Sequence, residues 1–324
     1  MSAGAGEAAT RLAAQVTRRW QTIDPLLPAA EALPPGCDTE LVAVGADGQP
    51  VAIGSCEHWV GTAGSLDLTW GAAQRFQLTV WLTSSDVTNA LDHLLSLWRD
   101  HLADVPGTGG EDTAAVVNWP SRDIDGVAAL LRHGLAPLAV IAARTRSRST
   151  LTADEPGTAR PGPRVRRAGP ADIDAVVRLG LEVIRYDAHF GSVIERPGTA
   201  NALHDEAAGL LARPEPWIWL AERDDTPVGL LYAEPPESAG WIAPMVRPAP
   251  VGYLTLMFVR PGDRGTGVSA ALAARFHEEV DAAGVAVTLL HYEQVNPLSA
   301  PFWSRQGYRP LWTTWEISPA RALR

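Results

Sequence analysis

A glycine-rich turn between an apolar strand and a helix constrains the fold of this chain more than any other feature. It reads Phe258-Val259-Arg260-Pro261-Gly262-Asp263-Arg264-Gly265-Thr266-Gly267-Val268-Ser269. Gly265 and Gly267 let the backbone curl tightly and come close to a ligand, because they carry no side chain. The free N–H groups of the turn and of the first helical turn point at one spot, which favours a pyrophosphate. The sequence therefore predicts a strand–turn–helix unit with an anion site, to which Arg264 adds a cation.

The same turn is compatible with a plain strand-to-helix connection that binds nothing. It is not a P-loop, because that motif needs a lysine, and the chain has none. It is not a dinucleotide fingerprint either, because the G-x-G-x-x-G spacing is missing.

Helix and strand patterns alternate on both sides of the turn. Apolar residues recur at helical spacing in residues 170–184, and the same spacing follows Thr199. Further helices are expected at 269–283 and 297–306, and strands at 164–168, 217–222, 228–234, 252–259, 285–292 and 309–316. This order predicts an α/β fold with a mixed sheet and helices on both of its faces.

The first half repeats this order more faintly, with helices at 7–22, 86–102 and 122–133. Its strands are expected at 40–45, 51–60, 76–82, 113–118 and 138–143. A segment rich in proline, glycine and small residues over 150–163 predicts a linker. We therefore expect two tandem domains of the same fold, at 1–149 and 164–324.

Composition excludes several classes of protein. The chain has 324 residues, is 46% hydrophobic and carries a net charge of −10, which argues against a nucleic-acid partner. No apolar run is long enough to cross a membrane, and the start of the chain does not resemble a signal peptide. Cys37 and Cys56 cannot build a structural zinc site, and we expect no metal. A cytoplasmic monomer or homodimer is expected.

A second motif follows the glycine turn at a suggestive distance. A strand ends at Tyr292, Asn296 precedes a helix, and Gly307-Tyr308 closes that helix with a left-handed cap. Together, the two motifs resemble the signature of the Gcn5-related N-acetyltransferase (GNAT) family. The resemblance covers roughly residues 164–320, and it departs from the family at Ser269, where glycine or alanine is usual.

The resemblance implies an acetyl-CoA-dependent enzyme whose cofactor lies between two splayed strands. Backbone groups of 256–259 would pair with the pantetheine arm, amides of 264–270 would hold the pyrophosphate, and Asn296 would fix the far side. The implied cofactor-binding residues are Leu256, Met257, Phe258, Val259, Arg264, Gly265, Thr266, Gly267, Val268, Ser269, Ala270, Asn296 and Trp303.

Transfer of an acetyl group to an amine needs a base, an oxyanion donor and an acid. In the family, a backbone amide before the phosphate loop is the oxyanion donor, which here implies Met257 or Phe258. The usual acid, a tyrosine, is replaced by Trp303, whose indole is no useful proton donor. We therefore expect Tyr308 as a candidate acid, with Tyr292 as another, or an unassisted thiolate. Glu234 and His291 are the candidate bases, each with a purely structural role as the alternative.

The resemblance also places an acceptor pocket at the end of the first helix, where Tyr186, Asp187 and His189 are the candidate contacts. The expected function is acetyl transfer to an amine, first of all a small-molecule amine. A non-catalytic acyl-CoA sensor or scaffold is the alternative.

The first half should bind no CoA. Its counterpart of the glycine turn, Thr83-Ser84-Ser85-Asp86-Val87-Thr88-Asn89, lacks glycine, and Asp86 is expected to cap the next helix and repel an anion.

Overall fold

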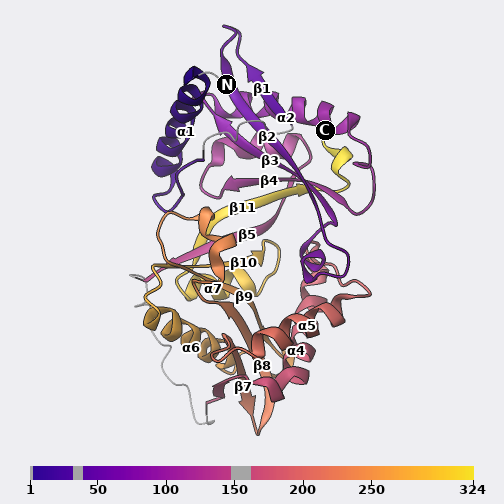
Figure 1. Cartoon of the computed structure of the whole chain (residues 1–324), viewed down its shortest axis with the longest axis vertical. Helices are drawn as coiled ribbons and strands as arrows, with labels where there is room; N and C mark the ends of the chain where they lie inside the picture. Colours follow the sequence, from indigo (N-terminus) through magenta and orange to yellow (C-terminus); the bar gives the residue numbers. More distant parts are fainter. Residues whose placement is uncertain (1–2, 32–38, 147–161) are drawn as a thin grey trace.

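The computed structural model describes residues 3–31, 39–146 and 162–324 (Figure 1). The expected linker at 150–163 lies almost wholly outside these residues. The predicted α/β class is confirmed, because helices flank one large mixed sheet.

The first half supplies two helices of four turns or more and five strands. Its elements are α1 (Ala3–Ile23), β1 (Glu40–Val44), β2 (Pro50–Val60), η1 (Leu66–Trp70), β3 (Gln74–Leu82), α2 (Val87–Asp104), β4 (Thr113–Pro120), η2 (Ile124–Gly126), α3 (Val127–Arg132) and β5 (Ala136–Thr145).

The second half begins on a short strand and ends on a long one. Its elements are β6 (Arg164–Arg167), η4 (Pro170–Asp172), α4 (Ile173–Asp187), η5 (Ala188–Phe190), α5 (Thr199–Leu211), β7 (Ile218–Arg223), β8 (Thr226–Glu234), η6 (Ala239–Trp241), η7 (Ala243–Met245), β9 (Val251–Val259), η8 (Pro261–Asp263), α6 (Val268–Ala282), β10 (Val287–Glu293), α7 (Ser299–Arg305), β11 (Arg309–Ile317) and η9 (Ala320–Ala322).

The two halves exchange their last strands within one 11-stranded sheet. The strand order is β1-β2-β3-β4-β11-β5-β10-β9-β8-β7-β6. Thus β5 of the first half pairs with β10 of the second, and β11 of the second half pairs with β4 of the first; both pairings are antiparallel. The halves are therefore joined through the middle of the sheet.

Each half places helices on both faces of the sheet. Val140, Thr313 and Trp119 are cross-strand partners on β5, β11 and β4, so their side chains point to one face. Val140 belongs to the core beneath α6 and α7, and Trp119 to the core beneath α2 and α3. The opposite face carries α4 and α5 over the second half and α1 over the first.

Candidate active site

The glycine turn leads from β9 into α6 as the sequence predicts. Gly265 and Gly267 have φ angles of +73° and +87°, in the left-handed region that favours glycine, and Gly267 is the N-cap of α6. A Cβ added at either residue would meet no atom within 4 Å. The space beside the turn is therefore open, and a ligand could approach the backbone there.

Strands β9 and β10 separate beside this turn. Their parallel pairing covers only Val251–Leu254 against Val287–Leu290, although β9 continues to Val259 and β10 to Glu293. On its other side, β9 carries a bulge, because Tyr232 and Ala233 of β8 oppose Leu256 and Leu254 and skip Thr255. The bulge and the separation together free backbone groups of β9 from the ladder.

Tyr186 and Asp187, two of the candidate acceptor contacts, lie against Arg264 and Asn296, two of the candidate cofactor-binding residues. The guanidinium of Arg264 lies 4.7 Å from the ring centre of Tyr186, and its Nε donates to the carbonyl of Val259 at 3.1 Å. Asn296 Nδ2 donates to Asp187 Oδ1 at 3.3 Å, while Asn296 Oδ1 accepts from the amide of Leu298. Burial raises the pKa of Asp187 to about 6. Tyr186 and Asp187 thus connect the end of α4 to the glycine turn and to Asn296, and His189 is exposed nearby in η5.

Glu234 borders a cavity of about 790 Å³ at the other end of β8. Its carboxylate accepts a hydrogen bond from Trp241 Nε1 at 2.9 Å and one from Thr255 Oγ1 at 3.4 Å, so it lies at the bulge. Burial raises its pKa above the ordinary value. The cavity is acidic, since four carboxylates and a single guanidinium line it: Glu206, Glu215, Glu234, Glu237 and Arg213.

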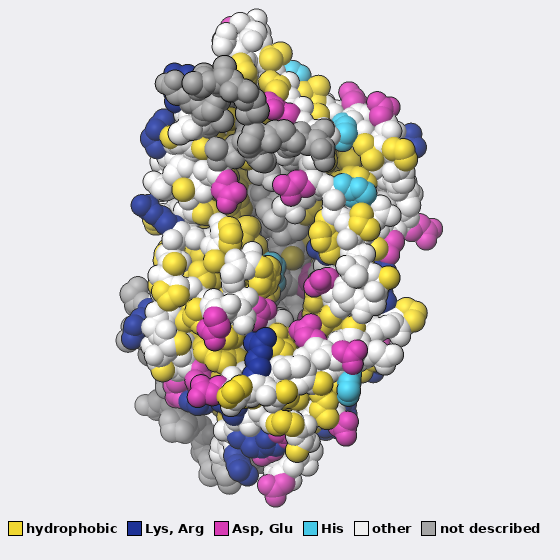
Figure 2. All heavy atoms as spheres, viewed as in Figure 1, with side chains coloured by type: hydrophobic (Ala, Val, Ile, Leu, Met, Phe, Trp, Pro, Cys, Tyr) yellow, Lys and Arg dark blue, Asp and Glu magenta, His cyan; other side chains and the backbone are white. Residues whose placement is uncertain are grey.

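His291 follows Leu290, the last residue of β10 that pairs with β9, at the point where these two strands separate. Its Nδ1 lies 2.9 Å from the hydroxyl of Tyr253, and its ring is nearly parallel to that of Trp241. His291 keeps solvent-accessible surface, and desolvation of its ring by the surrounding protein lowers the pKa of His291 to about 4. His291 is therefore neutral at pH 7. The middle of the molecule is visibly hollowed, and acidic side chains border the hollow (Figure 2).

Glu293 is a buried carboxyl group that the sequence analysis missed. It is 8% exposed, accepts a hydrogen bond from Ser192 on Oε1, and has no described partner on Oε2. Burial raises its pKa to about 7, and the neighbouring Asp187 contributes. Its only sequence signal is its position at the end of an apolar strand, three residues before Asn296.

The aromatic candidates of the last helix are packed in the core. Tyr308 is 3% exposed, its hydroxyl accepts from Thr288 Oγ1 at 3.1 Å, and burial raises its pKa to about 12. Trp303 is 6% exposed and packs edge-on against Tyr308, with ring centres 5.3 Å apart. The other candidate acid, Tyr292, is half-buried. Tyr308 is thus held as a packing residue, and Trp303 supports it.

In the described part of the first half, the connection from β3 to α2 at residues 83–86 contains no glycine. Asp86 caps α2, accepting from the amide of Asn89 at 3.2 Å, as the sequence predicts. Its carboxylate therefore lies where an anion would have to bind. Within the described ranges, no group of side chains could hold a metal ion, and no helix is long and apolar enough to cross a membrane.

Part of this chain matches a known family, and its fold is similar to that of known structures. Residues 186–308 match the sequence model of the acetyltransferase (GNAT) family. The fold is similar to a GCN5-related N-acetyltransferase from Sphaerobacter thermophilus, at 16% identity and a TM-score of 0.56 over 96% of this chain and 92% of that one. A GNAT-family acetyltransferase from Colwellia psychrerythraea aligns at 12% identity and a TM-score of 0.48, over 94% of this chain and 95% of that one. No curated protein matches the chain.

Proposed function

We propose that this protein transfers an acetyl group from acetyl-CoA to a small-molecule amine, because residues 186–308 match the sequence model of the acetyltransferase (GNAT) family. Acyl transfer is the general activity of that family. The observation that carries the proposal is the open glycine turn beside the separated ends of β9 and β10.

The residues present fit a CoA molecule. Amides of residues 264–270 bind the pyrophosphate, because the left-handed Gly265 and Gly267 leave the backbone uncovered. The pantetheine arm follows 256–259 in the gap that β10 leaves open. Asn296 borders the far side of this gap, with Asp187 fixing its amide.

The acceptor enters through the acidic cavity beside Glu234. Four carboxylates against one guanidinium attract a cationic amine, which is the protonated form of most primary amines near pH 7. The raised pKa of Glu234 makes it a better base than an ordinary carboxylate. Glu234 takes one proton from the ammonium group, and the neutral nitrogen then attacks the thioester carbonyl. The second proton, which the nitrogen loses as the amide forms, passes through solvent to the departing thiolate.

Backbone and solvent complete the transfer. The amide of Met257 or Phe258 donates to the carbonyl oxygen as it becomes negative, and the carbon–sulfur bond breaks as the amide bond forms. The thiolate leaves without Tyr308, whose hydroxyl is occupied in the core. His291 and Glu293 are the alternative bases, one neutral and one with a pKa near the working pH.

The proposal is tested by following free thiol release from acetyl-CoA with a panel of amines. Glu234→Gln should lower kcat about 100-fold or more, within the usual worth of a general base. Glu237→Gln, on the rim of the same cavity, should mainly raise KM. His291→Gln and Glu293→Gln separate the alternative bases. CoA binding without thiol release for any amine would instead support an acyl-CoA sensor.

A further inference from the structure

A second cavity, of about 250 Å³, lies in the first half, outside the acyl-transfer site. The cavity lies where β3 and β4 separate. Their parallel pairing ends at Gln77 and Val116, although β3 continues to Leu82 and β4 to Pro120. Side chains of the sheet form the floor of the cavity, among them Ser55, Gln77, Thr79 and Asn118, and α1 covers it from above. At ~30 Å³ per water molecule, the space corresponds to about eight waters.

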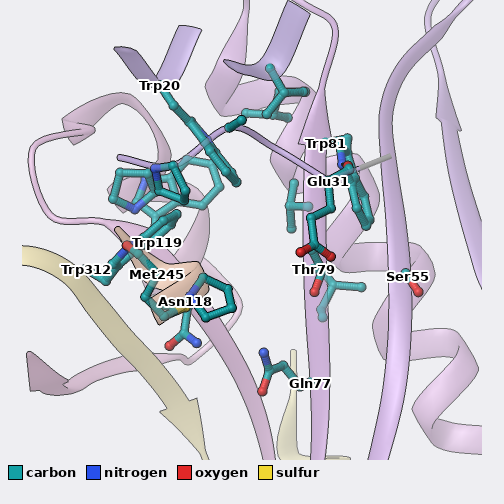
Figure 3. A pocket seen from close by; sticks show the side chains of 18 of the residues that line it. Trp20, Glu31, Ser55, Gln77, Thr79, Trp81, Asn118, Trp119, Met245 and Trp312 are labelled. Atoms are coloured by element: carbon teal, nitrogen blue, oxygen red, sulfur yellow. The ribbon is translucent and has the colours of Figure 1, made fainter. Parts of the chain in front are cut away.

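Aromatic rings in fixed positions form the walls. Trp20, Trp119 and Trp312 stand on one side and Trp81 on the other (Figure 3). The indole N–H groups of Trp81, Trp119 and Trp312 donate to backbone carbonyls at 3.0, 2.9 and 2.8 Å. These hydrogen bonds satisfy the N–H group of each of the three indoles and hold the rings in place. The cavity therefore presents preformed apolar surfaces.

Two acidic side chains and one unpartnered hydroxyl are among the groups that line this cavity. Glu31 and Glu57 line it, and neither forms an ion pair with a described residue, whereas Arg19 is paired with Asp123. Ser55 is 1% exposed, and its hydroxyl has no described hydrogen-bond partner. A buried hydroxyl without a partner costs free energy, and a ligand that bonds to it would recover that cost.

We propose that this cavity binds a small protonated amine with an apolar body. Carboxylates and the faces of tryptophan rings both attract a cation, and the rings also cover an apolar group. An anion such as a phosphate would be repelled by Glu31 and Glu57 and would find the one guanidinium already paired. Pro244, Met245 and Trp312 of the second half complete the cavity, so the bound amine contacts both halves.

The site is tested by isothermal titration of the full chain, without CoA, with phenethylamine, 2-phenylethanol and phenylacetate. These probes share a ring and differ in charge. We expect phenethylamine to bind about tenfold more tightly than 2-phenylethanol, and phenylacetate to bind most weakly. The double variant E31Q/E57Q should remove most of this preference, whereas E111Q, an exposed carboxylate that lines neither cavity, should leave it unchanged. E215Q/E237Q is measured in parallel, because the acyl-transfer cavity also attracts amines and its contribution is identified in this way.

A second variant separates binding from folding. Ser55→Ala removes a hydroxyl that makes no described bond, so thermal stability should be kept or rise. Binding of phenethylamine should nevertheless weaken about threefold or more, because one hydrogen bond is lost. Equal binding of all three probes, no binding at millimolar concentration, or a preference lost only in E215Q/E237Q would overturn the proposal.

Discussion

Glu293 should make the stability of this protein fall as the pH rises, and its replacement should remove that effect. Its pKa is about 7 in the folded chain against 4.5 in ordinary surroundings. Between these values the folded chain keeps the proton that the unfolded chain releases, so the free energy of unfolding decreases with pH. Each pH unit in this window is worth about 1.4 kcal/mol, and the window of 2.5 units gives about 3 kcal/mol in total.

Glu293→Gln keeps an acceptor for Ser192 and cannot ionise. Urea unfolding at pH 4.5 and at pH 8 should therefore show little change at the lower pH and a gain of about 3 kcal/mol for the variant at the higher one. Glu111→Gln is the matched control, because Glu111 is exposed, and it should show no such difference. A stability difference between Glu293→Gln and the parent chain that is the same at both pH values would refute the buried, protonated state.

Other predictions address the cofactor site and the joint between the halves. Gly267→Val should abolish stabilisation by CoA while the apo fold persists, because a branched side chain would enter the open space beside the turn; thermal melts with and without CoA measure this, and unchanged stabilisation would rule out the site. Titration of the whole chain with CoA should give one site, since Asp86 occupies the first half's helix terminus; two sites would show that this half was misread. Trp303→Phe should keep most turnover, because the ring packs in the core; a hundredfold loss would assign it a chemical role. Asp24→Ala should destabilise the fold by about 3 kcal/mol or more, because it leaves the guanidinium of Arg309 unpaired; urea unfolding measures the loss, and an unchanged midpoint would contradict it.

Local structure could be predicted because it depends on neighbouring residues. The strand–turn–helix unit around Gly265 and Gly267, the cap at Asp86 and the left-handed Gly307 all follow from the conformations that these residues favour. The order of helices and strands followed from the spacing of apolar side chains.

The exchange of β5 and β11 could not be predicted, because alternation along a strand says which face is buried and nothing about its neighbour. The same limit applies to the site. Tyr186 contacts Arg264, and Glu293 is buried beside Asp187. Both arrangements depend on segments that are distant in the sequence coming together. The Glu293 carboxyl could be seen in the sequence, but its burial, which gives it an unusual pKa, could not.

The exchanged strands also constrain the order in which the sheet can form during synthesis. β4 needs β11 as its neighbour, and β11 spans Arg309–Ile317, at the end of the chain. A ribosome that has made only the first half therefore exposes one open edge of β4, with unpaired backbone groups that invite wrong partners. The sheet closes only after β11 has been synthesised, so neither half is complete before that point.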